Sequence, residues 1–397
     1  MRILVVSPFL PWPEKSGSRV RTMTLLKSLT GHDVFLVAFR EDGEAVPDDV
    51  LGGLCRESYV FSKPALPRFA AVLNLVSPTP LLARRFACRE ARRTVRKLVE
   101  EKKIDCLIAE ALLVGEYVRP FREIYRVLDA HNIEFMRARG RSRTTRHPLK
   151  RLAYGLVADR LRRYERRTAR DFNLVLACSE ADRRVFETLV PGLRVVTVPN
   201  TVDLDLFRPV SARPASGTVV FTGTLWYEPN ADAACWLAEE IFPLVQKEAP
   251  EATLLIVGDD PPAAVQALGR RPGVRVVGPV EDIRPWLEQA AAYVAPVRMG
   301  SGTRQKLLDA MARGLPVVTT RKGCEGLDVE EGKHLLLAET PEEFRDRILD
   351  LLRDEALWSR LGAGGRRLVE EKYSRRAAIA AAAALWREIE AEVRAHG

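Results

Sequence analysis

The sequence lacks the features by which several classes of protein are recognised. It contains six cysteines, no two of them closer than 18 positions, and no Cys-x-x-Cys pair. This spacing argues against a zinc site or a disulfide framework and fits a reducing cytoplasm. The apolar stretches are strand-sized and end in charged or turn residues, whereas a membrane-spanning helix needs about 20 apolar residues.

A signal peptide is not indicated either. The first apolar run is short, Pro8, Pro11 and Pro13 soon follow it, and no small-residue cleavage site comes after them. We therefore interpret residues 2–6 as a buried strand. Hydrophobic residues make up 47% of the 397 positions and charged residues 29%, which is typical of a globular chain with a sizeable core. The length predicts two domains of about 200 residues each.

Short β-branched runs alternate with longer helical patterns along the whole chain. The expected strands are 2–6, 33–39, 58–61, 105–109, 126–129, 173–177, 194–198, 218–222, 252–257, 274–278, 292–296 and 316–319. The expected helices are 19–29, 84–101, 149–170, 231–247, 304–313, 341–352 and 375–395. This alternation predicts an α/β fold with two doubly wound, Rossmann-type parallel sheets, in which ligands bind beyond the carboxyl ends of the strands.

The clearest interruption of this pattern is the Pro-, Ser- and Ala-containing stretch 203–217, after which a new strand–turn–helix series begins. We expect an N-terminal domain over 1–205 and a C-terminal domain over 206–374. The Ala-rich helix in 375–397 has no strand after it, and we expect it to pack back on the N-terminal domain.

Positive charge is concentrated in one segment, which begins at Arg137 and ends at Arg170. It holds thirteen Lys and Arg against Asp159 and Glu165, so its net charge of +11 exceeds the +9 of the whole chain. We expect 137–147 to be a mobile loop and 149–170 to be an amphipathic helix. The apolar stripe of that helix should pack on the sheet, and its cationic face should make weak contact with an anionic membrane. The stripe consists of Leu149, Leu152, Leu156, Val157, Leu161 and Tyr164. No aromatic interleaving or known module supports nucleic-acid binding.

The strongest chemical motif is the run Arg298-Met-Gly300-Ser301-Gly302-Thr303-Arg304, which leads into a helix that carries Lys306 and Asp309. Two glycines before a helix let backbone N–H groups turn toward an anion, and the cations beside them suit a phosphate. Asp309 lies farther along the helix, where a carboxylate could reach ribose hydroxyls. A capped helix with solvated charges would account for the Gly-rich loop almost as well.

This motif resembles the donor-binding helix of retaining GT-B glycosyltransferases of family 4, the glycosyl transferases group 1. The resemblance covers nearly the whole chain, through segments 31–34, 177–180, 198–207, 220–223, 255–258 and 298–318. It implies that Asp309 holds the nucleotide ribose, and that Gly17 and Gly223 lie near the donor phosphates. His131, which follows an expected strand, matches the family's active-site His that contacts the donor sugar. The alternative for His131 is a cap on the next helix.

The sequence departs from the family pattern at two places. Ser301 stands where the family has the first Glu of its Glu-x7-Glu pattern, which contacts the donor sugar. Thr224 stands in place of an Arg, and the region of a following Lys reads Tyr227-Glu-Pro229-Asn230. The phosphate cations should therefore come from Arg298, Arg304 and Lys306, with Lys306 as the first choice. Glu325 either contacts the donor or caps the next segment.

The resemblance implies a metal-independent, retaining glycosyltransferase that uses a nucleotide-diphosphate sugar as co-substrate and needs no cofactor, with an acceptor-side domain over 1–205 and a nucleotide-sugar-binding domain over 206–374. The acceptor would be a glycan or a lipid-linked sugar in polysaccharide biosynthesis, and the enzyme cytoplasmic or peripheral on the cytoplasmic membrane face. His131, Arg304 and Lys306 are the expected catalytic residues. We interpret Asp203-Leu-Asp205, a metal-type Asp-x-Asp, as structural. The alternatives are a nucleotide-sugar 2-epimerase of the same fold and a non-catalytic sugar-nucleotide-binding partner.

Overall fold

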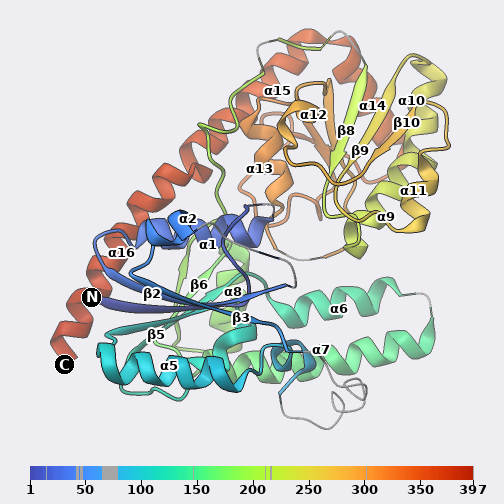
Figure 1. Ribbon diagram of the computed structural model, residues 1–397. Helices are drawn as coiled ribbons and strands as arrows, with labels where there is room; N and C mark the ends of the chain where they lie inside the picture. The colour runs from blue at the N-terminus through green and yellow to red at the C-terminus, as the bar shows by residue number, and fades with distance from the viewer. Residues whose placement is uncertain are drawn as a thin grey trace. The chain divides into compact units, whose positions relative to one another are not determined.

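The computed structural model describes residues 1–14, 16–41, 44, 48–64, 79–145, 147–210, 212–214, 217–300 and 302–396. The chain divides into two compact units (Figure 1). Unit 1 comprises Met1–Asn200 with Ala378–Gly397, and unit 2 comprises Thr201–Ala377. The boundaries expected from the sequence, after residues 205 and 374, lie close to these divisions.

Unit 1 is built on a seven-stranded parallel sheet with the order β3-β2-β1-β4-β5-β6-β7. Its strands are β1 Arg2–Ser7, β2 Asp33–Arg40, β3 Glu57–Ser62, β4 Cys106–Glu110, β5 Tyr125–Ala130, β6 Leu174–Ala177 and β7 Arg194–Thr197. Its helices are α1 Gly17–Ser28, α2 Asp48–Gly52, α4 Leu81–Arg84, α5 Arg89–Lys102, α6 Glu134–Thr144, α7 Pro148–Ala169 and α8 Glu180–Leu189, with a 3-10 turn at Leu112–Tyr117.

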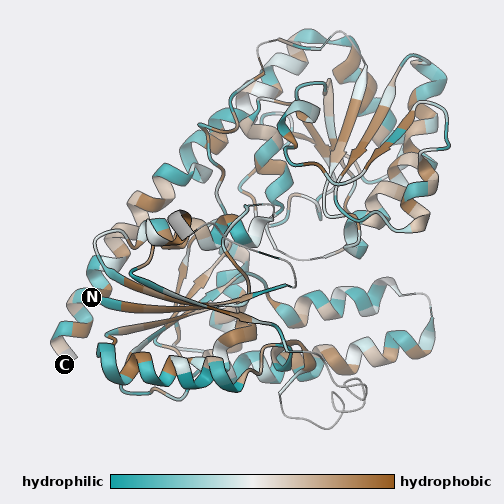
Figure 2. Cartoon of the chain, viewed as in Figure 1, coloured by the Kyte–Doolittle hydropathy of each residue, from teal (hydrophilic) through white to brown (hydrophobic). Residues whose placement is uncertain are grey.

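Each face of this sheet is covered by its own hydrophobic core. Strand β1 is buried on both faces, because Ile3 and Val5 point to one core and Leu4 and Val6 to the other. The first core is closed by α1 and by the end of α16, Arg375–His396, where the indole of Trp386 donates a hydrogen bond to the Ser28 hydroxyl at 3.0 Å. Figure 2 shows the brown, hydrophobic strands enclosed by helices whose outer faces are teal.

The basic segment forms a helical hairpin of α6 and α7, which lie side by side (Figure 1). The expectation of a mobile loop over 137–147 was wrong for α6. The buried carboxylate of Glu165 in α7 accepts the N–H groups of Glu134 and Phe135, each at 2.9 Å, and so caps the start of α6. A carboxylate supplied from another helix leaves no local signal in the sequence.

The expected apolar stripe of α7 was also wrong in its first half. Leu149, Leu152 and Leu156 are exposed by 71%, 63% and 54%. The later positions Leu161 and Tyr164 belong to the core, and Val157 packs against it. The first turns of α7 contact α6, where the Ser142 hydroxyl donates to the Arg151 carbonyl at 2.8 Å. Among the residues described, no helix is both long enough and apolar enough to cross a membrane.

Unit 2 contains a six-stranded parallel sheet with the order β10-β9-β8-β11-β12-β13. Its strands are β8 Thr218–Thr222, β9 Thr253–Val257, β10 Val274–Val277, β11 Ala292–Ala295, β12 Val317–Thr319 and β13 Leu336–Leu337. Its helices are α9 Glu228–Trp236, α10 Phe242–Glu248, α11 Ala263–Leu268, α12 Arg284–Leu287, α13 Gln305–Ala312, α14 Pro341–Arg353 and α15 Glu355–Leu368, with π-helical turns at Leu237–Ile241 and Val369–Tyr373. The two sheets thus repeat one Rossmann-type topology, as expected.

Candidate functional site

In unit 2 the loops after β8 and β9 make a close backbone contact. A Cβ atom added to Gly258 would lie 1.7 Å from the carbonyl oxygen of Gly223, so no side chain fits there. A Cβ added to Gly223 would lie 2.6 Å from Lys306 Nζ and 2.8 Å from Asn230 Nδ2. A backbone without side chains, an ammonium and an amide therefore meet at the carboxyl end of β8, where this fold places its ligands.

Lys306 is the second residue of α13, and its ammonium has unusual neighbours. Nζ donates to Asn230 Oδ1 at 2.7 Å and lies 4.3 Å from the centre of the Phe221 ring. Within the described residues it forms no ion pair. Burial, assisted by the charge of Arg304, holds the pKa of Lys306 well below its usual range. An anion bound here would supply the charge partner that this ammonium lacks.

The Gly-rich loop before α13 is a real turn. Gly300 and Gly302 have φ values of +102° and +85°, which residues other than glycine rarely adopt. The guanidinium of Arg304, the N-cap residue of α13, donates to the Met299 carbonyl at 3.2 Å. A Cβ on Gly300 would approach that guanidinium to 3.0 Å. Thr303 Oγ1 is buried without a hydrogen-bond partner among the described residues, and Ser301 lies outside them.

Asp309 is held one turn farther along α13. Gln305 Nε2 donates to Asp309 Oδ1 at 3.0 Å and to the Thr201 carbonyl at 2.9 Å. Burial raises the pKa of Asp309 to about 7, against the opposing effect of the Gln305 hydrogen bond. Near neutral pH this carboxyl can both donate and accept hydrogen bonds, which suits the ribose hydroxyls that the resemblance assigns to it.

Two expected donor-binding residues are engaged with charged partners elsewhere in unit 2. Arg298 donates to both oxygens of Asp232, at 3.1 and 2.7 Å, and its guanidinium lies 4.5 Å from the centre of the Trp236 ring. Glu325 forms an ion pair with Lys322. The structure therefore brings Gly223, Lys306 and Asn230 together, with Arg304 and Asp309 on the same helix, and matches Arg298 and Glu325 with other partners.

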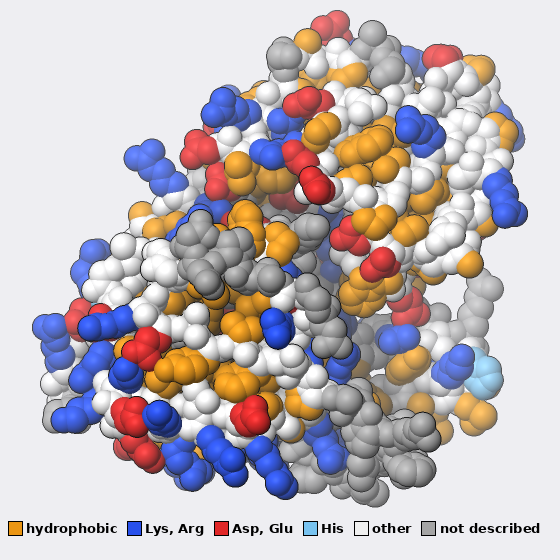
Figure 3. Space-filling model, in the orientation of Figure 1, with side chains coloured by type: hydrophobic (Ala, Val, Ile, Leu, Met, Phe, Trp, Pro, Cys, Tyr) orange, Lys and Arg blue, Asp and Glu red, His pale blue; other side chains and the backbone are white. Residues whose placement is uncertain are grey.

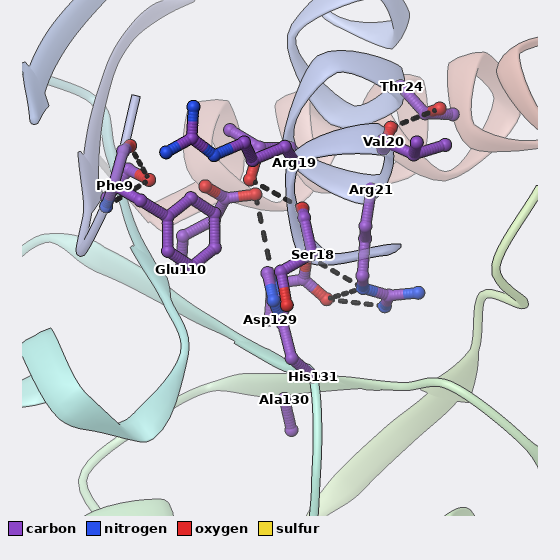
Figure 4. A network of polar contacts seen from close by, with 12 residues as sticks. Phe9, Ser18, Arg19, Val20, Arg21, Thr24, Glu110, Asp129, Ala130 and His131 are labelled. Atoms are coloured by element: carbon purple, nitrogen blue, oxygen red, sulfur yellow. Dashed lines mark hydrogen bonds and ion pairs between the residues drawn. The ribbon is translucent and has the colours of Figure 1, made fainter. Parts of the chain in front are cut away.

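Unit 1 has its own polar cluster at the carboxyl ends of β4 and β5, shown in Figure 4. His131 Nε2 lies 3.4 Å from Asp129 Oδ2 and 3.6 Å from Glu110 Oε1. Arg21 of α1 donates to both oxygens of Asp129, its Nε lying 2.9 and 3.0 Å from them. All four side chains are buried. Gly17 begins α1, the helix that carries Arg21.

The charges of this cluster determine its protonation. Burial disfavours a charged His131, but Asp129 and Glu110 outweigh this effect and raise the pKa of His131 to about 9. Burial likewise opposes ionisation of Asp129, but Arg21 and His131 lower its pKa to about 2. Near neutral pH the cluster therefore consists of two carboxylates, one guanidinium and one imidazolium.

This balance bears on metal binding. Glu110, Asp129 and His131 offer three ligand atoms within 4.8 Å of one another, a spacing that would also suit an ion. Arg21 already engages both oxygens of Asp129, and the four charges cancel. We therefore assign the cluster to an ionic network. The Asp203 carboxylate, in turn, is bound by Arg375 at 3.0 Å and by the N–H of Asp205 at 3.1 Å.

Three residues of these clusters were not expected from the sequence. Glu110 is the last residue of the buried strand β4, and Asp129 is the last but one of β5, the next strand along the chain; this parallel could have revealed Glu110. Asn230 was noted only as part of a region that lacks the family's Lys. Arg21 lies on α1 and donates to Asp129, which is 108 positions away in the sequence, so no local sequence pattern indicates this contact.

Residues 216–354 match the family model described as Glycosyl transferases group 1. The chain therefore contains a glycosyl transferases group 1 domain and is a glycosyltransferase. A protein of Klebsiella pneumoniae described as an "uncharacterized 44.6 kDa protein in cps region" is 22% identical to this glycosyltransferase over 388 residues, or 94% of this chain and 96% of that protein. The spore coat protein SA of Bacillus subtilis (strain 168) is 37% identical over 68 residues, which are 16% of this chain and 18% of that protein.

Solved structures share the fold of the glycosyltransferase. Sucrose-phosphate synthase from Thermosynechococcus elongatus matches 99% of this chain and 100% of its own, with a TM-score of 0.74 and 16% identity. HepE of Anabaena, in complex with UDP and glucose, matches 99% and 100%, with a TM-score of 0.68 and 15% identity. The two parallel-sheet domains of the glycosyltransferase therefore form a GT-B-like fold.

Proposed function

We propose that this glycosyltransferase moves a sugar from a nucleotide-diphosphate donor to a glycan or lipid-linked acceptor, with retention of configuration and without a metal ion. The observation that carries the proposal is the ammonium of Lys306, which faces the backbone of Gly223 and, among the described residues, has the neutral Asn230 as its hydrogen-bond partner. A diphosphate supplies the negative charge that this arrangement lacks. HepE, which shares the fold, is known as a complex with UDP-glucose.

The chemistry follows from the position of these charges. As the glycosidic bond lengthens, the diphosphate gains negative charge and the sugar becomes oxocarbenium-like. Lys306, Arg304 and the N-terminus of α13 stabilise the leaving group in this proposal, each preorganised contact contributing about 3 kcal/mol. Asp309 holds the ribose and His131 contacts the sugar. A front-face attack by the acceptor hydroxyl then gives retention.

The biological setting rests on the relatives. The protein of Klebsiella pneumoniae that matches nearly the whole chain is described as lying in a cps region. We therefore place this enzyme in polysaccharide biosynthesis, acting on the cytoplasmic side of the membrane. A lipid-linked acceptor would bring its substrate to that surface.

The test is turnover by the purified chain. A panel of nucleotide-diphosphate sugars is offered with and without oligosaccharide acceptors, and nucleotide release and the anomeric NMR signals of the product are recorded. We expect acceptor-dependent release with one donor, a retained anomer and unchanged rates in EDTA. Acceptor-independent release of an epimerised sugar would identify the 2-epimerase instead, and loss of turnover in EDTA would overturn metal independence.

The hairpin of α6 and α7 is the proposed membrane contact. The exposed Leu149, Leu152 and Leu156 lie beside the exposed Lys150 and Arg151. Figure 3 shows hydrophobic and basic side chains next to one another at the end of this hairpin. Exposed leucines among cations suit an anionic bilayer surface, into which the apolar groups insert while the cations bind headgroups.

Co-sedimentation with vesicles tests this contact. We expect binding to vesicles containing phosphatidylglycerol that falls steeply with salt, because each cation near the surface contributes about 1 kcal/mol. Lys150→Gln/Arg151→Gln should weaken it about tenfold or more, and Leu149→Gln/Leu152→Gln should also weaken it. The matched control, Arg93→Gln/Arg96→Gln, removes two exposed charges from α5. Equal loss in the control, or equal binding to neutral vesicles, would overturn the contact.

A further inference from the structure

The His131 ring is held from one side only. Its Nε2 faces the carboxylates of Asp129 and Glu110 at 3.4 and 3.6 Å, and the ring of Phe9 lies 5.8 Å away, centre to centre. Both ring nitrogens are buried without a hydrogen-bond partner among the described residues, but Nε2 has the two carboxylates at ion-pair distance, whereas Nδ1 forms no ion pair with these residues. His131 as a whole is 7% exposed. A buried polar atom without a partner is costly, so Nδ1 points to a ligand.

Glu110 decides which form of the ring is present. The groups that face it are Arg21 from α1, Glu110 from β4, Asp129 from β5 and the Cys178 thiol after β6, which donates to the His131 carbonyl at 3.4 Å. Arg21 already neutralises Asp129 through both oxygens. Both oxygens of Glu110 are buried without a hydrogen-bond partner in the described residues, and a protonated His131 is the cation that forms an ion pair with them there, at 3.6 Å, while Arg21 acts on Glu110 from farther away.

The protonation state sets the chemistry of Nδ1. A neutral imidazole that donates from Nε2 has an acceptor at Nδ1, whereas an imidazolium donates from both nitrogens. The same ring can thus either receive or supply a hydrogen bond at its free nitrogen. The carboxylate of Glu110, the second beside Nε2, favours the imidazolium, which donates a hydrogen bond from Nδ1.

We propose that Glu110 is a positioning residue that holds His131 as an imidazolium, so that Nδ1–H donates a hydrogen bond to an oxygen of the bound ligand. That the ligand oxygen belongs to a sugar rests on the proposed function. The charge state of His131 does not. The ion pairs at Nε2 also fix the ring plane, which aims the Nδ1–H bond before the ligand arrives.

The charge state is measured by NMR on the full chain with labelled histidine, with His131→Gln used to assign its signal among the five histidines. In the wild type we expect the His131 signal to titrate near pH 9, since its neighbours raise its pKa to about 9. In Glu110→Gln the midpoint should fall by at least about one pH unit, because one charge partner is lost. Glu110→Asp, which keeps the charge, should restore most of the shift, and the exposed Glu101→Gln should change nothing. A wild-type midpoint near pH 6.5, or no fall in Glu110→Gln, would overturn the proposal.

A pH profile of activity connects the charge to the role. Glu110→Gln should lose at least about twofold in kcat/KM at pH 8, more if the midpoint falls further, and recover most of this at pH 6, where the ring is protonated without help. Equal loss at both pH values would mean that Glu110 acts through structure alone and would overturn the positioning role. Failure of the proposed function looks different: the wild type turns over no donor, while the NMR midpoints still separate.

Discussion

The two polar clusters of this chain lie at the carboxyl ends of strands in two similar sheets, and their charges are arranged in opposite ways. In unit 1, Glu110, Asp129, Arg21 and His131 balance one another before any ligand binds. In unit 2, Lys306 faces a neutral amide and an aromatic ring, and its burial leaves the ammonium short of charge partners. The charge-balanced network of unit 1 can fix a hydrogen-bond donor in place. In unit 2 the ammonium that lacks a charge partner can bind an anion.

The largest expected effect, on the free energy of unfolding, comes from removing Arg21 from the charge-balanced network of unit 1. Arg21→Met leaves Asp129 buried without its cation, and we expect a loss of about 3–5 kcal/mol in the free energy of unfolding, measured in urea. The double variant Arg21→Met/Asp129→Asn should recover part of this loss, because the uncompensated charge is gone. Arg56→Met, which breaks the exposed pair with Asp33, should cost no more than about 1 kcal/mol. Similar losses in Arg21→Met and Arg56→Met would contradict the idea of a charge-balanced core.

Removal of the Lys306 ammonium from unit 2 should reduce catalysis and leave the fold intact. Lys306→Ala takes away the charge aimed at the leaving group, and we expect kcat/KM to fall about 100-fold or more with little change in thermal unfolding. Steady-state kinetics with the donor found in the panel measure this. Lys247→Ala, on the exposed surface of α10, is the control. An unchanged kcat/KM in Lys306→Ala would remove Lys306 from the mechanism.

A smaller effect is expected when the lysine of unit 2 is given a carboxylate partner, as the cations of unit 1 have. Asn230→Asp gives Lys306 a carboxylate partner, which competes with the phosphate, and we expect nucleotide-diphosphate affinity to fall about tenfold by calorimetry. Asn230→Ala removes the positioning contact without adding charge and should cost less. If Asn230→Asp binds the nucleotide as tightly as the wild type does, the missing charge partner is not what attracts the anion.

Much of the fold could be predicted, because parallel strands buried on both faces appear as apolar runs between turns. All twelve expected strands are present, and the two-residue β13 was missed because it is too short to have a pattern. The Gly-rich loop and α13 were predicted from local chemistry, since two glycines at positive φ precede the helix.

The partners within the clusters could not be predicted in the same way. Asn230 reaches Lys306 across 76 positions, and Arg21 reaches Asp129 across 108, so each contact depends on how the strands are ordered in the sheet. The exposed Leu149 and Leu152 show the converse error. Their helical spacing suggested a core stripe, but spacing cannot tell whether a sheet or solvent faces that stripe.

The cap that Glu165 provides gives the hairpin a cooperative character. Because the first N–H groups of α6 are bound by a carboxylate near the C-terminal end of α7, 31 positions from Glu134, order at the beginning of α6 depends on order in that part of α7. Burial raises the pKa of Glu165 to about 8, so the cap loses its proton as the pH rises from about 7 to about 9. The two helices therefore form one unit of local unfolding, and amide hydrogen exchange at the start of α6 would report the protonation of a single side chain in the neighbouring helix.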